Sequence, residues 1–175
     1  GPGDAIFDAM RNARGNMPID AEDNGFITTE VTALRDRHQI PGMHVLQFDV
    51  CDPDFQLSDV VENSVCYSGT HDNDTCVGWF SQLQPHERDF VFEVLGVPAT
   101  EDIAQLMIET AMQSRADMAI VPLQDFLGLD GRSRMNTPGV GEGNWTWLFD
   151  WDLLSDQLAE RTRALVAASG RLHER

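Results

Sequence analysis

Lysine is absent from this sequence of 175 residues, and its twelve basic residues are all arginine. Aspartate and glutamate number 29, which gives a formal net charge of −17 at pH 7. A surface of this sign repels phosphate backbones, so we expect no nucleic-acid partner. Self-repulsion on this scale is tolerated best where salt screens it. Two explanations for the charge stay open: adaptation to salt, or a high-GC genome that encodes arginine in place of lysine.

Long apolar runs are absent as well. No stretch approaches the roughly 18–20 apolar residues that cross a bilayer, and the first residues show no signal-peptide pattern, so we expect no membrane partner. Cysteine is scarce, because Cys51, Cys66 and Cys76 form no C-x-x-C pair and lack the spacing of zinc ligands. We therefore expect reduced thiols in a cytoplasmic protein. The hydrophobic fraction of 42% is typical of a folded globular domain.

Short apolar segments alternate with longer amphipathic segments along the chain. We predict strands at 17–21, 43–48, 65–68 and 118–121. We predict helices at 4–14, from Thr28 or Thr29 to about 38, from Pro85 to 95, from Thr100 onward and from about 152 to 168. This alternation predicts an α/β fold of parallel βαβ units. The polar residues gather just after the strands, where such folds, barrels in particular, carry their chemistry.

Three acidic clusters follow predicted strands: 20–23, Asp49 with Asp52 and Asp54, and 71–74. Carboxylates in such places can act as general acids or stabilise a cation. For Asp52 and Asp54 we favour the simpler explanation, that an acidic protein has acidic loops. The six polar residues at 70–75 precede an apolar segment, so a buried or cleft position must satisfy all of them. Their His and Asp content also admits a divalent-metal phosphoesterase site, which we keep as a minor alternative.

Four motifs occur in an order that identifies a known family. They are A-E-D-N-G at 21–25, P-G-M-H-V-L-Q-F at 41–48, Y-S-G-T-H-D-N-D-T at 67–75 followed by G-W at 78–79, and R-M-N-T-P-G at 134–139 followed by G-N-W-T-W at 143–147. Together they strongly resemble amylomaltase, the 4-α-glucanotransferase (disproportionating enzyme) family of the α-amylase clan, over nearly the whole chain. The resemblance implies a (β/α)₈ barrel that transfers α-1,4-glucan segments to a 4-hydroxyl of glucose or a maltooligosaccharide. It implies a retaining mechanism with neither a metal nor a cofactor.

The resemblance also assigns site residues. Glu22 matches the general acid/base after the fifth barrel strand. Asp72 matches the third carboxylate, which stabilises the oxocarbenium-like transition state after the seventh strand. The residues that the resemblance places in contact with sugar are His71, Asn73, Asp49, Asn136 and Trp145. Trp79 and Trp147 are further candidates for stacking on sugar, although for Trp79 packing behind the barrel is the favoured alternative.

This chain also departs from the family pattern. Asn24 stands where the family usually has Leu, and Leu148 stands where it usually has Arg. The family's nucleophile, an Asp in an Arg-x-Asp-His motif on the fourth strand, has no counterpart here. Because a complete barrel takes about 250 residues, we expect residues 1–175 to be the C-terminal half, strands five to eight, of the barrel domain.

Three expectations follow from a half barrel. The isolated chain should be inactive, because it lacks the nucleophile. It should also dimerise or aggregate through its unpaired strand edges, although its oligomeric state does not follow from the sequence. A non-catalytic glucan-binding module remains an alternative from a different functional class.

Overall fold

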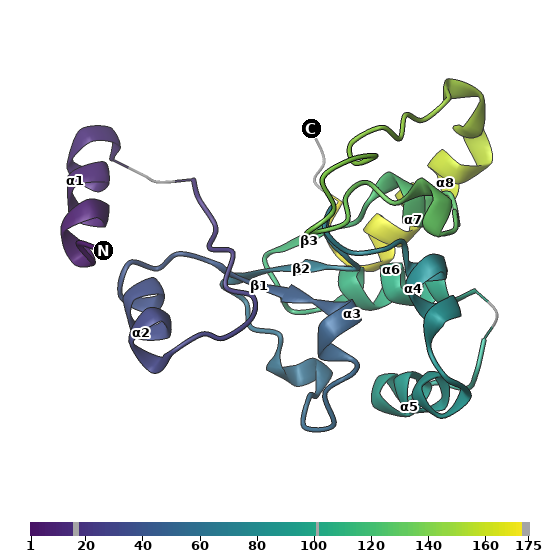
Figure 1. Ribbon diagram of the computed structural model, residues 1–175, viewed down its shortest axis with the longest axis horizontal. Helices are drawn as coiled ribbons and strands as arrows, with labels where there is room; N and C mark the ends of the chain where they lie inside the picture. The colour runs from purple at the N-terminus through teal and green to yellow at the C-terminus, as the bar shows by residue number, and fades with distance from the viewer. Residues whose placement is uncertain (16–17, 101, 173–175) are drawn as a thin grey trace.

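The sheet at the centre of the fold has three parallel strands, in a computed structural model that describes residues 1–15, 18–100 and 102–172 (Figure 1). The strands are β1 (Gly42–Val45), β2 (Ser64–Tyr67) and β3 (Met118–Ile120), and they lie in the order β1-β2-β3. Gly42 pairs with Ser64, and Val65 pairs with Met118. Parallel strands in chain order place all their carboxyl ends at one edge of the sheet. The predicted βαβ arrangement is therefore confirmed for these three strands.

The helices connect and cover these strands. The longer ones are α1 (Asp4–Arg14), α2 (Thr29–Arg37), α5 (Pro85–Leu95), α6 (Ile103–Gln113) and α8 (Asp156–Ala168). Short helices are α3 (Leu46–Asp49), α4 (Cys76–Gln82) and α7 (Leu123–Phe126), with 3₁₀ turns at Leu57–Asp59, Gly131–Ser133 and Trp151–Leu153. The predicted helix from Pro85 is confirmed, since proline has no N–H to leave unbonded at a helix start and Gly96 ends the helix with a φ of 66°. The helix at 4–14 is also confirmed.

The predicted strand at 17–21 is wrong for residues 18–21, which form no strand, while Met17 lies outside the described residues. This segment runs beside β1, and Ala21 N–H donates a hydrogen bond to the carbonyl of Pro41 (2.8 Å). Pro18 and Pro41 each lack an N–H, so the two segments miss donors that a regular ladder needs. The predicted strand at 43–48 is also too long, because the chain turns into α3 directly after Val45.

Two helix predictions also need correction, and one helix was not predicted. The helix predicted from Thr100 begins at Ile103, because the Asp102 side chain accepts from the N–H of Gln105 and caps it there. The last helix begins at Asp156 rather than near 152, since a 3₁₀ turn occupies Trp151–Leu153. The sequence reasoning missed α4 altogether, because its seven residues are too few to show a helical period.

The core lies between the sheet and the helices α4, α5 and α6. Its completely buried members include Leu46, Val60, Cys66 and Met107. Burial raises the pKa of the Cys66 thiol to about 11, which keeps it protonated and inert. α6 lies against the sheet, with α8 beyond it, whereas α1 and α2 lie at the opposite end of the molecule from α8 (Figure 1). None of the helices in the described ranges is long and apolar enough to cross a membrane.

β3 is covered less completely than β1 and β2. Met118 and Ile120 point to the same face of the strand, and each is 46% exposed. Sheets of parallel strands are normally covered on both faces. This face of β3 therefore has the apolar character of an interior without being covered by the described residues.

Candidate active site

A cleft of about 430 Å³ opens at the edge of the sheet where the strands end. Its wall contains the ends of β2 and β3, the loop at 69–75 and the segment at 20–22. Its principal polar lining residues are Asp20, Glu22, Tyr67, His71, Asn73, Asp74 and Arg134. The chemistry is expected at this edge, because the carboxyl ends of parallel strands converge there.

The loop at 69–75 is held in shape mostly by its own polar groups. The N–H and the hydroxyl of Thr70 both donate to Oδ1 of Asn73, at 2.9 and 2.8 Å. Gln47 donates from Nε2 to the carbonyl of Asp74 (2.8 Å) and lies against Gly69, where a Cβ would stand 2.6 Å from that nitrogen. Gly69 is therefore needed for this close approach. Asn73 lines the cleft, but its side-chain oxygen Oδ1 already accepts the two hydrogen bonds that close the turn.

Asp74 has a structural position in the same loop. Its Oδ1 accepts from the N–H of Thr75 (2.8 Å) and its Oδ2 accepts from Nε2 of Gln82 (2.8 Å). The carboxylate lies against Gly78 and Gly131, and a Cβ on Gly131 would stand 2.9 Å from it. Asp74 thus joins the loop to the first turn of α4 and to the 3₁₀ turn at 131–133, with both carboxylate oxygens occupied.

Asp72 is joined to a loop more than sixty residues further along the chain. Its Oδ1 accepts from Nδ2 of Asn136 (2.5 Å), and its main-chain carbonyl accepts from Nη2 of Arg134 (2.7 Å). The N–H of Asn136 donates to the carbonyl of His71 (3.1 Å), and Nε2 of His71 lies 3.3 Å from Oδ1 of Asp72. The Asp72 side chain remains 40% exposed. The structure therefore brings three predicted site residues together, each contributed by a loop rather than by a strand.

Trp145 stands beside this cluster. Its ring centroid lies 5.1 Å from that of His71, and the side chain is 61% exposed while still lining the cleft. Its backbone has a φ of 60°, a region that costs free energy for any residue other than glycine. The N–H of Trp145 donates to the carbonyl of Met135 (2.7 Å), which holds this conformation. An exposed ring fixed at a polar cleft is well suited to stacking on a flat ligand face.

Glu22 reaches the cleft from the segment that precedes α2. It is exposed and lines the cleft together with Asp20 and Tyr67. The Tyr67 hydroxyl donates to Oδ2 of Asp20 at 3.5 Å. Burial, with the nearby charges of Asp20 and Glu22, raises the pKa of Tyr67, so the hydroxyl stays protonated as a donor. Glu22 and His71 thus border one cleft, and their roles remain predictions.

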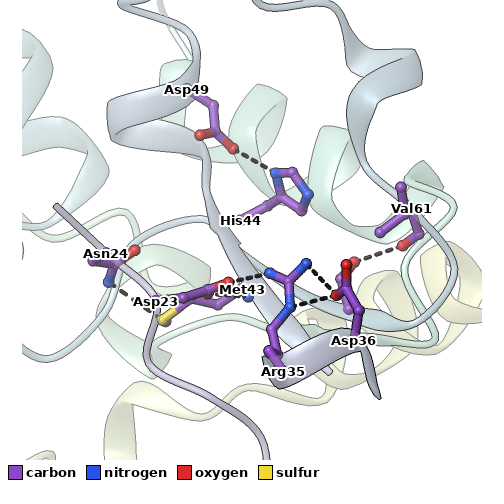
Figure 2. Close-up of polar contacts among 9 residues, drawn as sticks. Asp23, Asn24, Arg35, Asp36, Met43, His44, Asp49 and Val61 are labelled. Atoms are coloured by element: carbon purple, nitrogen blue, oxygen red, sulfur yellow. Dashed lines mark hydrogen bonds and ion pairs between the residues drawn. The ribbon is translucent and has the colours of Figure 1, made fainter. Parts of the chain in front are cut away.

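Asp49 does not line this cleft. It lies in a second hollow of about 460 Å³, where its Oδ2 is 3.2 Å from Nδ1 of His44 (Figure 2). The contact of Asp49 with sugar stays a prediction, and Asp49 lies on a different surface from Glu22. Trp79 is partly buried and packs against the core, in agreement with the packing alternative.

Sequence reasoning missed Asp125, which lies in α7 and is only 2% exposed. Its carboxylate accepts from Oγ of Ser68 (2.7 Å), from the N–H of Cys76 (2.8 Å) and from Sγ of Cys76 (3.2 Å). Burial raises the pKa of Asp125. Because Ser68 and Cys76 flank the loop at 69–75, Asp125 holds both ends of that loop. The sequence carries no signal for this, since Asp125 stands in an ordinary amphipathic segment.

No group of three or more His, Cys, Asp or Glu side chains is arranged to hold a metal ion within residues 1–15, 18–100 and 102–172. The phosphoesterase alternative therefore gains no support from this part of the chain.

Comparison with known proteins places the chain in a family. The model of the 4-alpha-glucanotransferase family matches residues 1–153. The chain belongs to this family. A 4-alpha-glucanotransferase of Synechocystis sp. is 43% identical over 175 aligned positions, which cover 97% of this chain and 35% of that protein. The 4-alpha-glucanotransferase of Thermus thermophilus is 39% identical over 188 aligned positions, which cover 98% of this chain and 36% of the relative.

A solved amylomaltase structure has the same fold. The amylomaltase from Streptococcus agalactiae in complex with acarbose superposes with a TM-score of 0.91 and 26% identity, over 99% of this chain and 36% of that one. The family predicted from the four motifs is thus confirmed, and so is an α/β fold of the amylomaltase type. This chain spans about a third of the length of the relatives that it matches.

Proposed function

We propose that this chain is part of a 4-α-glucanotransferase, which moves segments of α-1,4-glucan onto a 4-hydroxyl of glucose or a maltooligosaccharide. The observation that carries this proposal is the cleft at the carboxyl edge of the sheet, in a chain that matches the family over residues 1–153. Glu22 enters this cleft from one segment, and the loop bearing His71 and Asp72 borders it from another.

The chemistry follows from a retaining mechanism. Glu22 donates a proton to the glycosidic oxygen that leaves, and later removes the proton of the acceptor hydroxyl that attacks the glycosyl-enzyme. The Asp72 carboxylate stabilises the positive charge that develops on the sugar ring. Its hydrogen bond from Asn136 orients the carboxylate for this task. The nucleophilic carboxylate, which such enzymes hold roughly 5–5.5 Å from the acid, is contributed by a part of the enzyme outside this chain.

We also propose that the chain supplies strands five to eight of the barrel. Two observations support this. The face of β3 that carries Met118 and Ile120 is half exposed, and no strand in the described ranges pairs with the outer edge of β1. The relatives are about three times as long as this chain, which leaves ample length for the other barrel strands.

The cleft also suggests how sugar is held. His71 and Trp145 lie side by side at the rim, where the tryptophan ring can stack on a sugar face and the imidazole can bind a hydroxyl. Asn136 has its amide nitrogen directed to Asp72, so we assign its main contribution to the orientation of that carboxylate. Asn73 likewise supports the loop more than it contacts the ligand.

The test compares two proteins incubated with maltotriose, with products followed by chromatography. The first is the chain alone. The second, called the completed enzyme here, is a chimaera in which this chain replaces the matched segment of the Synechocystis relative. We expect the completed enzyme to form glucose and longer oligosaccharides, its Glu22→Gln variant to lose this activity, and the chain alone to form neither product. Activity of the chain alone would contradict its partial nature, and an inactive completed enzyme would contradict the proposed function.

A second candidate is glucan binding without catalysis, which the exposed Trp145 ring beside His71 favours. Isothermal titration of the chain alone with acarbose or maltoheptaose measures it. Binding that is lost in Trp145→Ala, in a chain whose completed form transfers no glucan, would establish this candidate in place of the enzyme.

A further inference from the structure

The backbone of Glu22 is attached to β1 on both of its sides. The N–H of Ala21, one residue before, donates to the carbonyl of Pro41 (2.8 Å). Oδ1 of Asp23, one residue after, accepts from the N–H of Met43 (2.8 Å). The second contact replaces a strand hydrogen bond with one to a side chain. Glu22 is thereby fixed relative to the edge of β1, although no regular strand pairing forms there.

The segment around Glu22 separates two surfaces. Asp20 and Glu22 line the cleft, whereas Asp23 lines the second hollow. This alternation is expected of an extended backbone, in which successive side chains point to opposite sides. Asp23 therefore lies outside the cleft and can affect reaction there only through its neighbour.

Asp23 is held by an arginine from α2. Its Oδ2 forms an ion pair with Nη1 of Arg35, and Arg35 also donates to Oδ1 of Asp36 from Nε (2.9 Å) and Nη2 (2.7 Å) (Figure 2). The Asp23 side chain is only 10% exposed and that of Arg35 is 24% exposed. Both oxygens of Asp23 are thus engaged in a nearly buried position. Removing Arg35 leaves the Asp23 carboxylate without an ion-pair partner and with little access to water, which is far more costly than losing a surface pair.

Gly42 shows that β1 accommodates this ion pair closely. A Cβ at Gly42 would stand 2.7 Å from Oδ2 of Asp23 and would overlap the guanidinium of Arg35. The first residue of β1 therefore has no room for a side chain while the pair is in place. The ion pair, the strand edge and the segment bearing Glu22 form one packed unit.

We propose that Asp23 and Arg35 are positioning residues for Glu22. They fix the position and the direction of the Glu22 carboxyl in the cleft. The inference rests on the proposed acid/base role of Glu22. Proton transfer requires the carboxyl to lie within hydrogen-bond reach of the glycosidic oxygen. A displacement of about 1 Å can reduce a rate by about 100-fold. Weakening the Asp23–Arg35 ion pair therefore slows the steps that need proton transfer, and does not change the rates of the other steps.

The test uses two donors with the completed enzyme. Maltotriose has a poor leaving group and needs the proton from Glu22. α-Maltosyl fluoride releases fluoride with little protonation, and azide then attacks the glycosyl-enzyme without a general base. We expect Asp23→Asn to lower kcat on maltotriose by about 10- to 100-fold while KM changes little. Fluoride release in the presence of azide should stay within about twofold of the unmodified enzyme.

A graded pair of variants tests the contribution of Arg35. Arg35→Lys keeps the positive charge but loses the planar fork, whereas Arg35→Met removes the charge. We expect the loss on maltotriose to be smaller for Arg35→Lys than for Arg35→Met. Glu62→Gln is the matched control, because Glu62 pairs with Arg115 at 3.2 Å on the open surface, with side chains 74% and 62% exposed. It should leave both donors unaffected.

The outcomes separate this inference from the proposed function. If Glu22→Gln itself shows no selective loss on maltotriose, the acid/base role fails and the proposed function with it. If Glu22→Gln shows that loss and Asp23→Asn retains full activity on both donors, only the positioning role fails. Equal losses on both donors, or loss of folded protein in Asp23→Asn and Arg35→Lys alike, would also overturn it, because the pair would then be a general support of the fold.

Discussion

Asn136→Ala tests whether the loop at 134–145 acts on Asp72. The substitution removes the 2.5 Å hydrogen bond from Nδ2 of Asn136 to Oδ1 of Asp72. It leaves the contact from Arg134 to the Asp72 carbonyl, because that bond comes from a different side chain. The N–H of Asn136 can also still reach the His71 carbonyl. The loop should therefore keep its place while the carboxylate loses the amide that orients it.

The size of the effect follows from the character of this bond. A hydrogen bond to a charged group contributes about 1.5–3 kcal/mol when it is buried. The Asp72 side chain is 40% exposed, so we reduce this to about 1–1.5 kcal/mol. If the bond acts fully in the transition state, kcat/KM on maltotriose falls by roughly 5- to 13-fold. Asn136→Asp should be more harmful, since two like charges about 3 Å apart repel by about 1.4 kcal/mol even in water, a further factor of about ten.

The assay is steady-state transfer by the completed enzyme on maltotriose at pH 7. Asn136→Asp should retain less activity than Asn136→Ala, because the new carboxylate repels that of Asp72. Asn144→Ala is the control, since Asn144 closes the same loop by donating to the Val140 carbonyl (2.8 Å) without touching Asp72. Equal losses in Asn136→Ala and Asn144→Ala would refute the reasoning, and so would an Asn136→Asp variant as active as Asn136→Ala.

Three further predictions concern stability and accessibility. Asp125→Ala should lower the free energy of unfolding by about 2–5 kcal/mol in urea titrations followed by circular dichroism, because the Cys76 N–H and a buried hydroxyl lose their acceptor; a loss below 1 kcal/mol would contradict this. In the native chain at pH 8, Ellman's reagent should modify Cys51 alone, because burial raises the pKa of the other two thiols and shields them; all three should react in urea. The hydrogen bond with His38 lowers the pKa of Asp4 below its usual 3.8, so the link between α1 and α2 is stabilising above that pH and is lost as the pH falls through the lower value. The protection factors of the α1 amides, which are corrected for the intrinsic pH dependence of exchange, should then fall in acid, and constant protection factors down to pH 2 would disprove the link.

Much of the secondary structure could be predicted from the amino-acid sequence. The helices at 4–14 and 85–95 were predicted with their ends, because their limits depend on glycine and proline acting within one turn. The strand prediction failed at residues 18–21 because Pro18 and Pro41 lack the N–H donors of a ladder, and only folding brings their two segments side by side. The motif at 70–75 was recognised as a unit, but which of its residues support the loop could not be predicted. Asp74 is fully occupied by structural bonds, and Asn73 closes the turn.

The order of the residues was sufficient to identify the family, because four motifs in a fixed succession are unlikely to recur by accident, and to indicate Glu22 and Asp72. Folding was needed to show which groups meet. The amide of Asn136 turns to Asp72 across more than sixty residues, and Arg35 joins Asp23 on the side of the chain that faces away from the cleft. Burial of Asp125 likewise depends on what packs around α7. Local signals arise from contacts within a few residues, whereas these side chains owe their environment to segments brought together by the sheet. For this reason the candidate site residues could be proposed from the sequence, whereas the residues that hold them in place could not.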